Sequence, residues 1–213
     1  MNIGMVPVRR GSVRLARKNY LKIGKLSVLE IALLKAIESK VFDRIVVNTD
    51  DPMLEEVTSR MGVDFYLRKE VLASSQATSD QVVLDFFYNN DGDRVFWVNT
   101  VSPLQTINDI KNFVNIGQKV SWRSGVSINP KQVHILFDNC PLNFDWESGF
   151  ARTQDLKPVK CFNYAMMGWH RKMMEKLENA QLFDEETQLV ESSRWSSILL
   201  KNEDDMALIT KIS

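Results

Sequence analysis

Cysteine and histidine are scarce in the sequence. Only two cysteines, Cys140 and Cys161, occur among 213 residues, and they form neither a CxxC pair nor the spacing of a metal site. A disulfide scaffold, a zinc module and a catalytic thiol with a histidine partner are therefore not expected. The two histidines, His134 and His170, have no mutual spacing or acidic neighbour that indicates a triad or a metal site. We expect ordinary structural roles for all of these side chains.

The chain also lacks an excess of charge and any long hydrophobic run. Lysine plus arginine and aspartate plus glutamate both number 27, so nothing favours nucleic acid or an anionic membrane as the main partner. No apolar run approaches the about 20 residues of a membrane span, and the run before Arg9 and Arg10 is too short for a signal peptide. We therefore expect a cytoplasmic protein that contacts neither a membrane nor nucleic acid.

What the sequence does contain is the composition of a globular domain. Hydrophobic residues make up 44% of the chain and charged residues 25%, with nine glycines and six prolines. These values are ordinary for a folded protein and argue against disorder. A length of 213 residues lies within the range of single domains. We expect one domain over residues 1–213.

Short apolar runs alternate with helical patterns as far as residue 128. Strands are predicted at 2–8, 44–48, 63–67, 94–98 and 125–128. Helices are predicted at 27–39, 52–61, 80–88 and 108–118. Such alternation predicts an α/β fold of three layers, in which helices cover both faces of a mainly parallel, twisted, Rossmann-like sheet. Ligands of such sheets bind beyond the carboxyl ends of the strands.

Capping and stop signals set the ends of two predicted helices. Ser27 and Glu30 form a capping box at the start of the first helix. Asp51 is the predicted N-cap of the next, with Pro52 at the first helical position and Gly62 at the end. A turn followed by this cap accounts for the polar residues that follow the second strand without giving them a catalytic role.

Aromatic and turn residues replace the alternation between residues 129 and 160. This segment is too apolar for a disordered linker and too irregular for another strand-helix unit. We predict a hairpin-like excursion that packs on a partner subunit. Strands are then predicted at 162–169 and 198–200, and helices at 172–179 and 203–211.

A basic loop follows the first predicted strand. Five cations and no acidic residue occur in it, and Gly11 and Ser12 supply a bend with exposed backbone N–H groups. The cations are Arg9, Arg10, Arg14, Arg17 and Lys18. A loop of this kind at the carboxyl end of a strand suits a polyphosphate, which arginine binds in bidentate fashion. A solvated loop, or one that touches RNA without specificity, is the alternative.

Five segments of the chain are similar to segments of one protein family. They are PVRRGSVRLARKN (7–19), VVNTDD (46–51), LRKEVLA (67–73), WVNTVSPLQ (97–105) and RTQDLKP (152–158). In order and spacing they resemble the acylneuraminate and related nonulosonate cytidylyltransferases, across nearly the whole chain. The resemblance implies the nucleotide-diphospho-sugar transferase form of the Rossmann-like fold.

The resemblance implies a reaction and an assembly. Members of this family bind CTP, and a hydroxyl group of an acidic sugar attacks the α-phosphate, so that pyrophosphate leaves with the help of Mg²⁺. A homodimer is implied as well, in which the excursion at 129–160 reaches the site of the neighbouring subunit.

The resemblance also implies roles for individual residues. The nucleotide would bind to Arg9, Gly11, Ser12, Arg14, Lys18, Asn19, Arg68, Thr78 and Asn99. The acceptor sugar would bind to Ser102, Arg152, Gln154 and Asn163. The catalytic cations would be Arg9 and Lys18. Lys201 is a third catalytic candidate that the resemblance does not supply, because it stands at a position where the family differs.

The sequence departs from the family pattern at four positions. Val13 stands where the family loop has a lysine. Leu199 and Lys201 stand where the family has two metal-binding aspartates, and neither side chain ligates Mg²⁺. Tyr164 replaces the glycine of an Asn-Gly pair and would crowd a pocket that glycine leaves open.

Three functions are therefore compatible with the sequence. The first is an active cytidylyltransferase with altered metal use or an altered substrate, in which Lys201 would supply the charge of the metal. The second is a catalytically impaired homologue that binds a nucleotide or a partner subunit without turnover. The third is an RNA-binding module, which the confinement of the cations to one loop disfavours.

Overall fold

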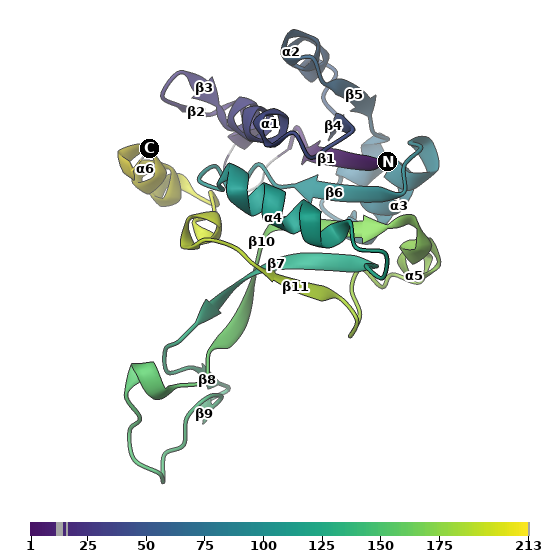
Figure 1. Ribbon diagram of the computed structural model, residues 1–213. Coiled ribbons are helices and arrows are strands. Elements are labelled where there is room, and N and C mark those ends of the chain that lie inside the picture. Colours follow the sequence, from purple (N-terminus) through teal and green to yellow (C-terminus); the bar gives the residue numbers. More distant parts are fainter. Residues whose placement is uncertain (12–14, 16, 213) are drawn as a thin grey trace.

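The computed structural model describes residues 1–11, 15 and 17–212, and its centre is a seven-stranded sheet (Figure 1). The strand order is β11-β7-β10-β6-β1-β4-β5. The strands span Asn2–Val8 (β1), Arg44–Thr49 (β4), Asp64–Leu67 (β5), Arg94–Val98 (β6), Ser124–Lys131 (β7), Val159–His170 (β10) and Gln188–Glu191 (β11). All neighbouring pairs are parallel except those of β10, which is antiparallel to both β6 and β7. The predicted mainly parallel α/β sheet is therefore confirmed.

Helices cover both faces of this sheet, as predicted. They span Val28–Ser39 (α1), Leu54–Met61 (α2), Ser79–Asn89 (α3), Ile107–Gly117 (α4), Met174–Glu178 (α5) and Glu203–Ile212 (α6). None of the helices in the described part of the chain has the length and apolar content to cross a bilayer. Along β1, Ile3 and Met5 pack with α3 and α5, whereas Val6 and Val8 pack with α1 and α4. All four side chains are at most 2% exposed, so burial on both faces holds the layers together.

An aromatic stack fills the α4 side of the core. The rings of Phe96 and Trp122 lie 5.5 Å apart at an angle of 22°. A Cβ atom on Gly168 would lie 2.9 Å from the Phe96 ring, and one on Gly117 would lie 2.5 Å from it. Real Cβ atoms do not approach so closely, so both glycines are required for the ring to fit.

The capping box at the start of α1 is present as predicted. The Ser27 hydroxyl accepts the Glu30 N–H at 3.2 Å, and the Glu30 carboxylate accepts the Ser27 N–H at 2.8 Å. Gly62 ends α2 with a φ angle of 67°, a left-handed conformation that favours glycine. Local signals therefore predict these two helix ends correctly.

The predicted N-cap role of Asp51 is wrong. Helix α2 begins at Leu54 rather than at Pro52. Asp51 instead accepts the N–H of Met53 at 3.2 Å and the hydroxyl of Tyr20 at 2.6 Å. Its carboxylate stabilises the turn before the helix and connects that turn to the chain beyond the basic loop.

The last quarter of the chain differs most from the prediction. No strand forms at 198–200, although the Leu200 N–H donates to the carbonyl of Val101 at 2.7 Å. The last strand is β11, which sequence analysis missed because Val190 is its single buried residue. The helix predicted at 172–179 is divided between a 3₁₀ turn at Arg171–Met173 and α5.

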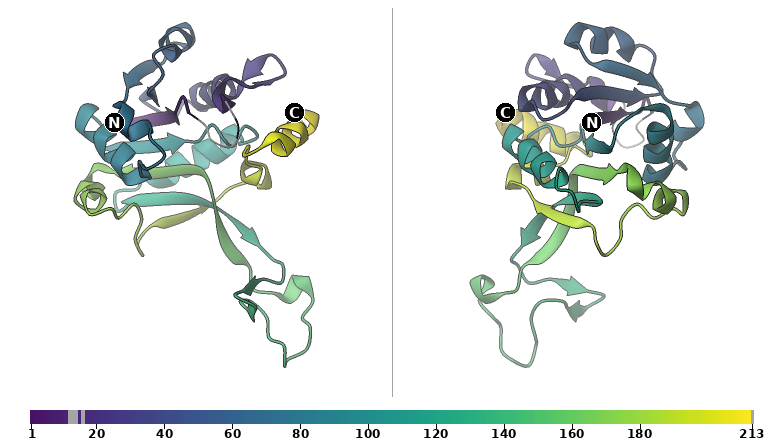
Figure 2. Two further views of the ribbon diagram at one scale, coloured as in Figure 1. Left: turned by 180° about the vertical axis from the view of Figure 1, so that it is seen from behind. Right: turned by 45° about the vertical axis from the view of Figure 1, so that its right-hand side comes forward.

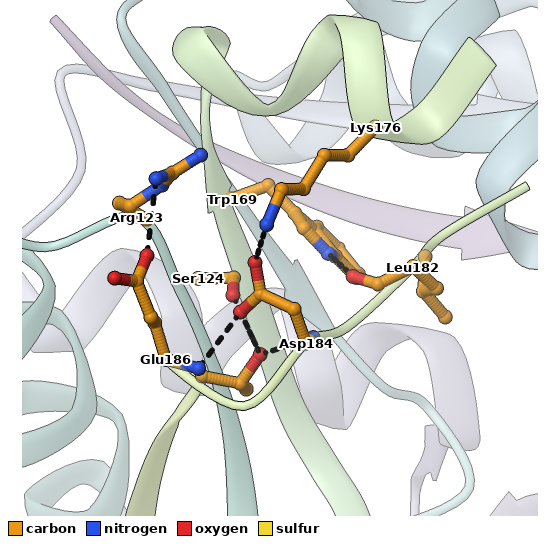
Figure 3. A network of polar contacts seen from close by, with 8 residues as sticks. Arg123, Ser124, Trp169, Lys176, Leu182, Asp184 and Glu186 are labelled. Atoms are coloured by element: carbon orange, nitrogen blue, oxygen red, sulfur yellow. Dashed lines mark hydrogen bonds and ion pairs between the residues drawn. The ribbon is translucent and has the colours of Figure 1, made fainter. Parts of the chain in front are cut away.

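Polar contacts hold the segment before β11 against β7 and α5 (Figure 3). Lys176 on α5 forms an ion pair with Asp184, and its hydrogen bond holds the pKa of that carboxyl below its usual value. Arg123, which directly precedes β7, donates to Glu186 at 3.0 Å. These contacts set the position from which β11 enters the sheet.

The excursion at 129–160 projects from the body of the protein (Figures 1 and 2). β7 and β10 continue into it, with Lys131 paired to Val159, and a small hairpin forms between β8 (Leu136–Phe137) and β9 (Cys140–Pro141). Phe137 and Phe150 are 75% and 74% exposed. Packing of this surface on a partner subunit stays a prediction.

Asp109, in the first turn of α4, binds the segment that follows β11. Its carboxylate accepts the N–H of Ser193 at 2.8 Å and the hydroxyls of Ser193, Ser196 and Thr106 at 2.7, 2.9 and 2.8 Å. Burial alone would raise the pKa of Asp109, but these hydrogen bonds outweigh it and lower the pKa below its usual value. The ionised carboxylate therefore connects α4 to the carboxyl-terminal segment.

We expect Asp109→Asn to lower the free energy of unfolding by about 1 to 3 kcal/mol near neutral pH, because the amide removes a charged acceptor. The folded-state pKa is lowered, so this stabilisation is present above the unfolded value of about 4 and is lost as pH falls through the folded pKa. Denaturant unfolding of both proteins across that range measures the difference, which should narrow with falling pH. The matched control is Asp91→Asn in an exposed loop, and a pH-independent difference would contradict the assignment.

Candidate functional site

The basic loop leaves the carboxyl end of β1 and is connected to the end of β4. Arg9 is half-buried, and Arg10 and Gly11 are exposed. The Arg10 N–H donates to Asp50 at 2.9 Å, which fixes the first turn of the loop against the neighbouring strand. Two of the predicted nucleotide-binding residues, Ser12 and Arg14, lie outside the described residues, as does Val13.

Arg68 lies behind this loop and is buried, with only 6% of its surface exposed. Its Nη2 donates to the carbonyl of Val8 at 2.9 Å and lies 3.8 Å from the Asp50 carboxylate. Burial, with a smaller contribution from Arg9, lowers the pKa of Arg68 below its usual value, and Asp50 opposes the shift. Arginine nevertheless stays protonated at any pH at which proteins fold.

The Nε atom of Arg68 is buried and has no hydrogen-bond partner among the described residues. A buried donor of a charged group is seldom left unpaired, because the loss of hydration is costly. Arg10, Asp50, Arg68 and Lys69 also line a hollow of about 540 Å³ at this edge of the sheet. The arrangement suits a ligand that brings acceptor atoms or negative charge.

Asn19 is at the far end of the basic loop and is 7% exposed. Its side-chain oxygen accepts the hydroxyl of Thr100 at 2.8 Å, and its amide group lies 3.5 Å from the carbonyl oxygen of Arg9. Lys18, which begins the 3₁₀ turn Lys18–Tyr20, is half-buried beside it. The loop is therefore closed on itself and connected to the end of β6.

Asn99 directly follows β6 and is half-buried. Its backbone N–H donates to the carbonyl of Ala165 at 3.1 Å, its side-chain amide donates to the carbonyl of Tyr164 at 3.2 Å, and its side-chain oxygen accepts the Val101 N–H at 3.3 Å. These bonds bring β10 to the same edge of the sheet as the basic loop. Of the predicted site residues, the structure thus gathers Arg9, Gly11, Lys18, Asn19, Arg68 and Asn99.

Ser102 and Asn163 are predicted to contact the acceptor. In the structure their side chains form hydrogen bonds with other residues of the same chain. The Ser102 hydroxyl donates to the carbonyl of Ser196 at 3.0 Å, and the side chain is 3% exposed. Asn163 is 5% exposed and bonds to Ser127 at 2.5 Å and Ser192 at 2.7 Å. Both residues bond to the carboxyl-terminal segment and are nearly fully buried, and their contact with an acceptor stays a prediction.

Two other predicted residues lie on the excursion, and a third is at the start of α3. Arg152 is exposed on the excursion and pairs with Asp155 at 2.7 Å, and Gln154 is exposed next to it. Thr78 is the N-cap of α3 and is also exposed. Because the excursion projects from the body (Figure 2), Arg152 and Gln154 do not join the gathered residues within one chain.

The segment that carries Lys201 lies beside the basic loop. Leu200 is fully buried in a cluster that includes Leu15 of the loop and Val28 at the start of α1. Lys201 follows directly and is exposed. The backbone of Lys201 therefore lies close to Leu15 of the loop and to Val101, which follows β6 and accepts the Leu200 N–H.

The described residues do not fit a magnesium site at this position. Leu199 has no ligating atom, and Asp205 is occupied as an acceptor for the N–H groups of Lys201 and Asn202 at 2.8 and 3.0 Å, where it caps α6. Within residues 1–11, 15 and 17–212, no group of three or more His, Cys, Asp or Glu side chains is placed to hold a metal ion. Among the described residues at the carboxyl edge of the sheet, the positive charge therefore comes from lysine and arginine side chains.

Sequence analysis missed two polar contributors to the site. Asp50 accepts from the backbone of Arg10 and faces Arg68, and Thr100 holds Asn19. The available signal was their position, because each occurs within two residues of the carboxyl end of a strand. Nearby, burial and the hydrogen bond to Asp51 raise the pKa of Tyr20 to about 12, so this hydroxyl remains a donor.

Two curated proteins are similar to this chain over part of their length. An N-acylneuraminate cytidylyltransferase of Streptococcus agalactiae is 28% identical over 178 residues, which cover 77% of this chain and 42% of the relative. A CMP-N,N'-diacetyllegionaminic acid synthase of Legionella pneumophila is 28% identical over 134 residues, covering 60% of this chain and 57% of the relative. The chain thus spans about two fifths to three fifths of the length of these curated relatives.

Solved structures share the fold at low sequence identity. CMP:2-keto-3-deoxy-manno-octonic acid synthetase in complex with CTP has a TM-score of 0.72 at 12% identity, over 99% of this chain and 97% of that one. A 4-diphosphocytidyl-2C-methyl-D-erythritol synthase of Anaerococcus prevotii has a TM-score of 0.70 at 16% identity, over 99% and 95%. The cytidylyltransferase family model matches residues 3–134, more than half of the sequence, and the chain therefore belongs to the cytidylyltransferase family.

Proposed function

We propose that this protein transfers CMP from CTP to an acidic, nonulosonic sugar and releases pyrophosphate. The observation that carries the proposal is the buried Arg68, whose unpaired Nε lies behind a basic loop at the carboxyl edge of the sheet. The names of the relatives, which act on acylneuraminic and legionaminic acids, support the choice of acceptor.

The proposed reaction is an in-line displacement at phosphorus. A hydroxyl oxygen of the sugar attacks the α-phosphorus of CTP, the bond from that phosphorus to the bridging oxygen of the β-phosphate breaks, and pyrophosphate leaves. The proton of the hydroxyl passes to solvent. Such a reaction depends mainly on positioning and on positive charge around the phosphates. Arg9 and Lys18, on the loop at the end of β1, are the groups that supply this charge.

Lys201 is proposed as a fixed cation in place of a metal ion. The described residues do not fit a magnesium site, and Leu200, which directly precedes Lys201, packs against Leu15 of the basic loop. An ammonium at this position neutralises charge on the leaving pyrophosphate without proton transfer. No step of the proposed reaction is assigned to a metal.

We expect pyrophosphate release from CTP and a nonulosonic acid to persist in EDTA, because the positive charge comes from the protein. Lys201→Ala should lower kcat by about 100- to 1,000-fold, which is typical for removal of one group that stabilises developing charge. The matched control is Lys211→Ala on α6, which is exposed as well. Complete loss of turnover in EDTA, or equal rates for Lys201→Ala and the control, would contradict the role of Lys201.

A catalytically impaired homologue is the second candidate, and Leu199 and Lys201 at the expected ligand positions favour it. This candidate predicts CTP binding without turnover. A Leu199→Asp, Lys201→Asp double variant distinguishes the two proposals in a pyrophosphate-release assay with Mg²⁺. Turnover that appears only in the double variant supports the impaired homologue, whereas turnover by the natural protein excludes it.

Arg68→Met should weaken CTP binding by roughly 10- to 100-fold, because a charged hydrogen bond contributes about 1.5 to 3 kcal/mol. Isothermal titration calorimetry with CTP measures the change, and thermal unfolding reports whether the variant is folded. The matched control is Arg60→Met, which removes an exposed arginine paired with Glu30. Unchanged CTP affinity in a folded Arg68→Met protein would place the nucleotide elsewhere.

We also propose a homodimer formed through the excursion at 129–160. Phe137 and Phe150 are about three-quarters exposed, and Arg152 could meet an acceptor only at the site of a second copy.

Phe137→Asp with Phe150→Asp should give a monomer in light scattering, since charges would be buried in the interface. Val120→Asp, at a residue that is 93% exposed outside the excursion, should leave the mass unchanged. A natural protein of monomeric mass would refute the dimer.

A further inference from the structure

Tyr164 has a backbone conformation that a tyrosine rarely adopts. Its φ angle is 54°, in the left-handed region, and among the described residues with positive φ it is the one aromatic. The residue lies where the register of β10 against β7 shifts, between Phe162 and Met167. A bulky side chain in this region is strained, and strained residues gather at ligand-binding sites.

The surrounding bonds force this conformation. Asn99 donates its side-chain amide to the carbonyl of Tyr164 and its backbone N–H to the carbonyl of Ala165. On the other side, Asn163 accepts the Ala165 N–H at 3.2 Å and bonds to Ser192 and Ser197. The backbone of residue 164 is thus fixed from both sides, and glycine would adopt the same path at lower cost.

The ring of Tyr164 is not held in the core. It is 45% exposed, and Phe162 next to it is 42% exposed. The two rings meet edge to face with centroids 5.7 Å apart, and Phe162 contacts Phe183 at 6.2 Å. Two exposed aromatic side chains therefore form a short apolar wall. They do so at the edge of the sheet where Asn99 bonds to β10 and the adjacent Thr100 bonds to Asn19 at the end of the basic loop.

We propose that Tyr164 is a specificity-determining residue for the acceptor sugar. Its ring packs on the acceptor and favours an acidic sugar that carries a methyl or acyl-methyl group at this side over one with a hydroxyl group there. This inference rests on the proposed function, because it assigns the acceptor to the edge at which the nucleotide is expected.

Physical chemistry sets the direction of the preference. A methyl group gains by leaving water for an aromatic wall, whereas a hydroxyl group placed there loses hydration without a partner. The Phe162 and Tyr164 rings offer apolar faces for such a group, and the Asn99 side chain is already bonded to the chain through both of its polar atoms. One apolar group that is buried against such a wall changes kcat/KM by roughly tenfold.

The test compares two nonulosonic acids that differ only in a terminal methyl or hydroxymethyl group. The natural protein should prefer the methyl form by roughly tenfold in kcat/KM. Tyr164→Phe should keep the preference, because the ring remains. Tyr164→Gly should remove it, with a changed KM for the sugar and an unchanged KM for CTP. The control is Ala180→Gly, which relaxes another positive φ angle, 57°, on the loop after α5.

Sugar binding measured by tryptophan fluorescence in the presence of CTP separates this inference from the proposed reaction. Discrimination in binding by the natural protein, lost in Tyr164→Gly, supports the inference even if no pyrophosphate is released. The inference is overturned if Tyr164→Gly retains the preference, or if Tyr164→Phe loses it to the same extent as the glycine variant. Failure of every sugar to bind overturns both the inference and the proposed function.

Discussion

The antiparallel strand β10, inserted between β6 and β7, determines which residues reach the carboxyl edge of the sheet. Because it runs against its neighbours, its first half lies at the edge where β1, β4 and β6 end. The excursion, Asn163 and Tyr164 all precede or belong to that half. A parallel strand at this position would have brought its other end to the site. The antiparallel pairing therefore provides one wall of the site and the root of the excursion.

The positively charged side chains at the carboxyl edge of the sheet differ in burial. Arg68 is buried beneath the loop and held by the carbonyl of Val8, whereas Arg10 and Lys201 are exposed. The buried cation has a fixed geometry and little freedom to relax, which is the condition under which a positive charge stabilises an anion most effectively. Before a ligand binds, the exposed cations are screened by water and salt, and they act on a charged ligand mainly by attraction at a distance. Asp109 acts on Lys201 indirectly, since it accepts hydrogen bonds from Ser193 and Ser196 in the segment that leads to Lys201.

The parallel part of the fold could be predicted from the sequence because each unit has its own local signal. β1 and β4 are continuous apolar runs, and the Ser27–Glu30 box marks α1. β11 lacked such a signal, since one buried residue gives no periodicity, and its position depends on contacts such as Lys176–Asp184. The proximity of Arg9 and Arg68 could be predicted, because each directly follows a strand whose carboxyl end lies at the same edge of the sheet, and Asn19 is at the far end of the loop that begins with Arg9. The burial of Ser102 and Asn163 could not be predicted in this way. It depends on bonds to Ser196 and Ser192, which lie 94 and 29 residues further along the chain.

The aromatic stack of Phe96 and Trp122 has a consequence for how the sequence can change. Gly168 and Gly117, on β10 and α4, both lie against Phe96, so three elements share the volume of one ring. A larger residue at either glycine requires a smaller one at Phe96, and that change would leave a void beside Trp122. Substitutions at these positions are therefore coupled, and a gradual path through single replacements would pass through overpacked or hollow intermediates. We therefore expect substitutions at Phe96, Gly117 and Gly168 to occur together in related sequences rather than one at a time.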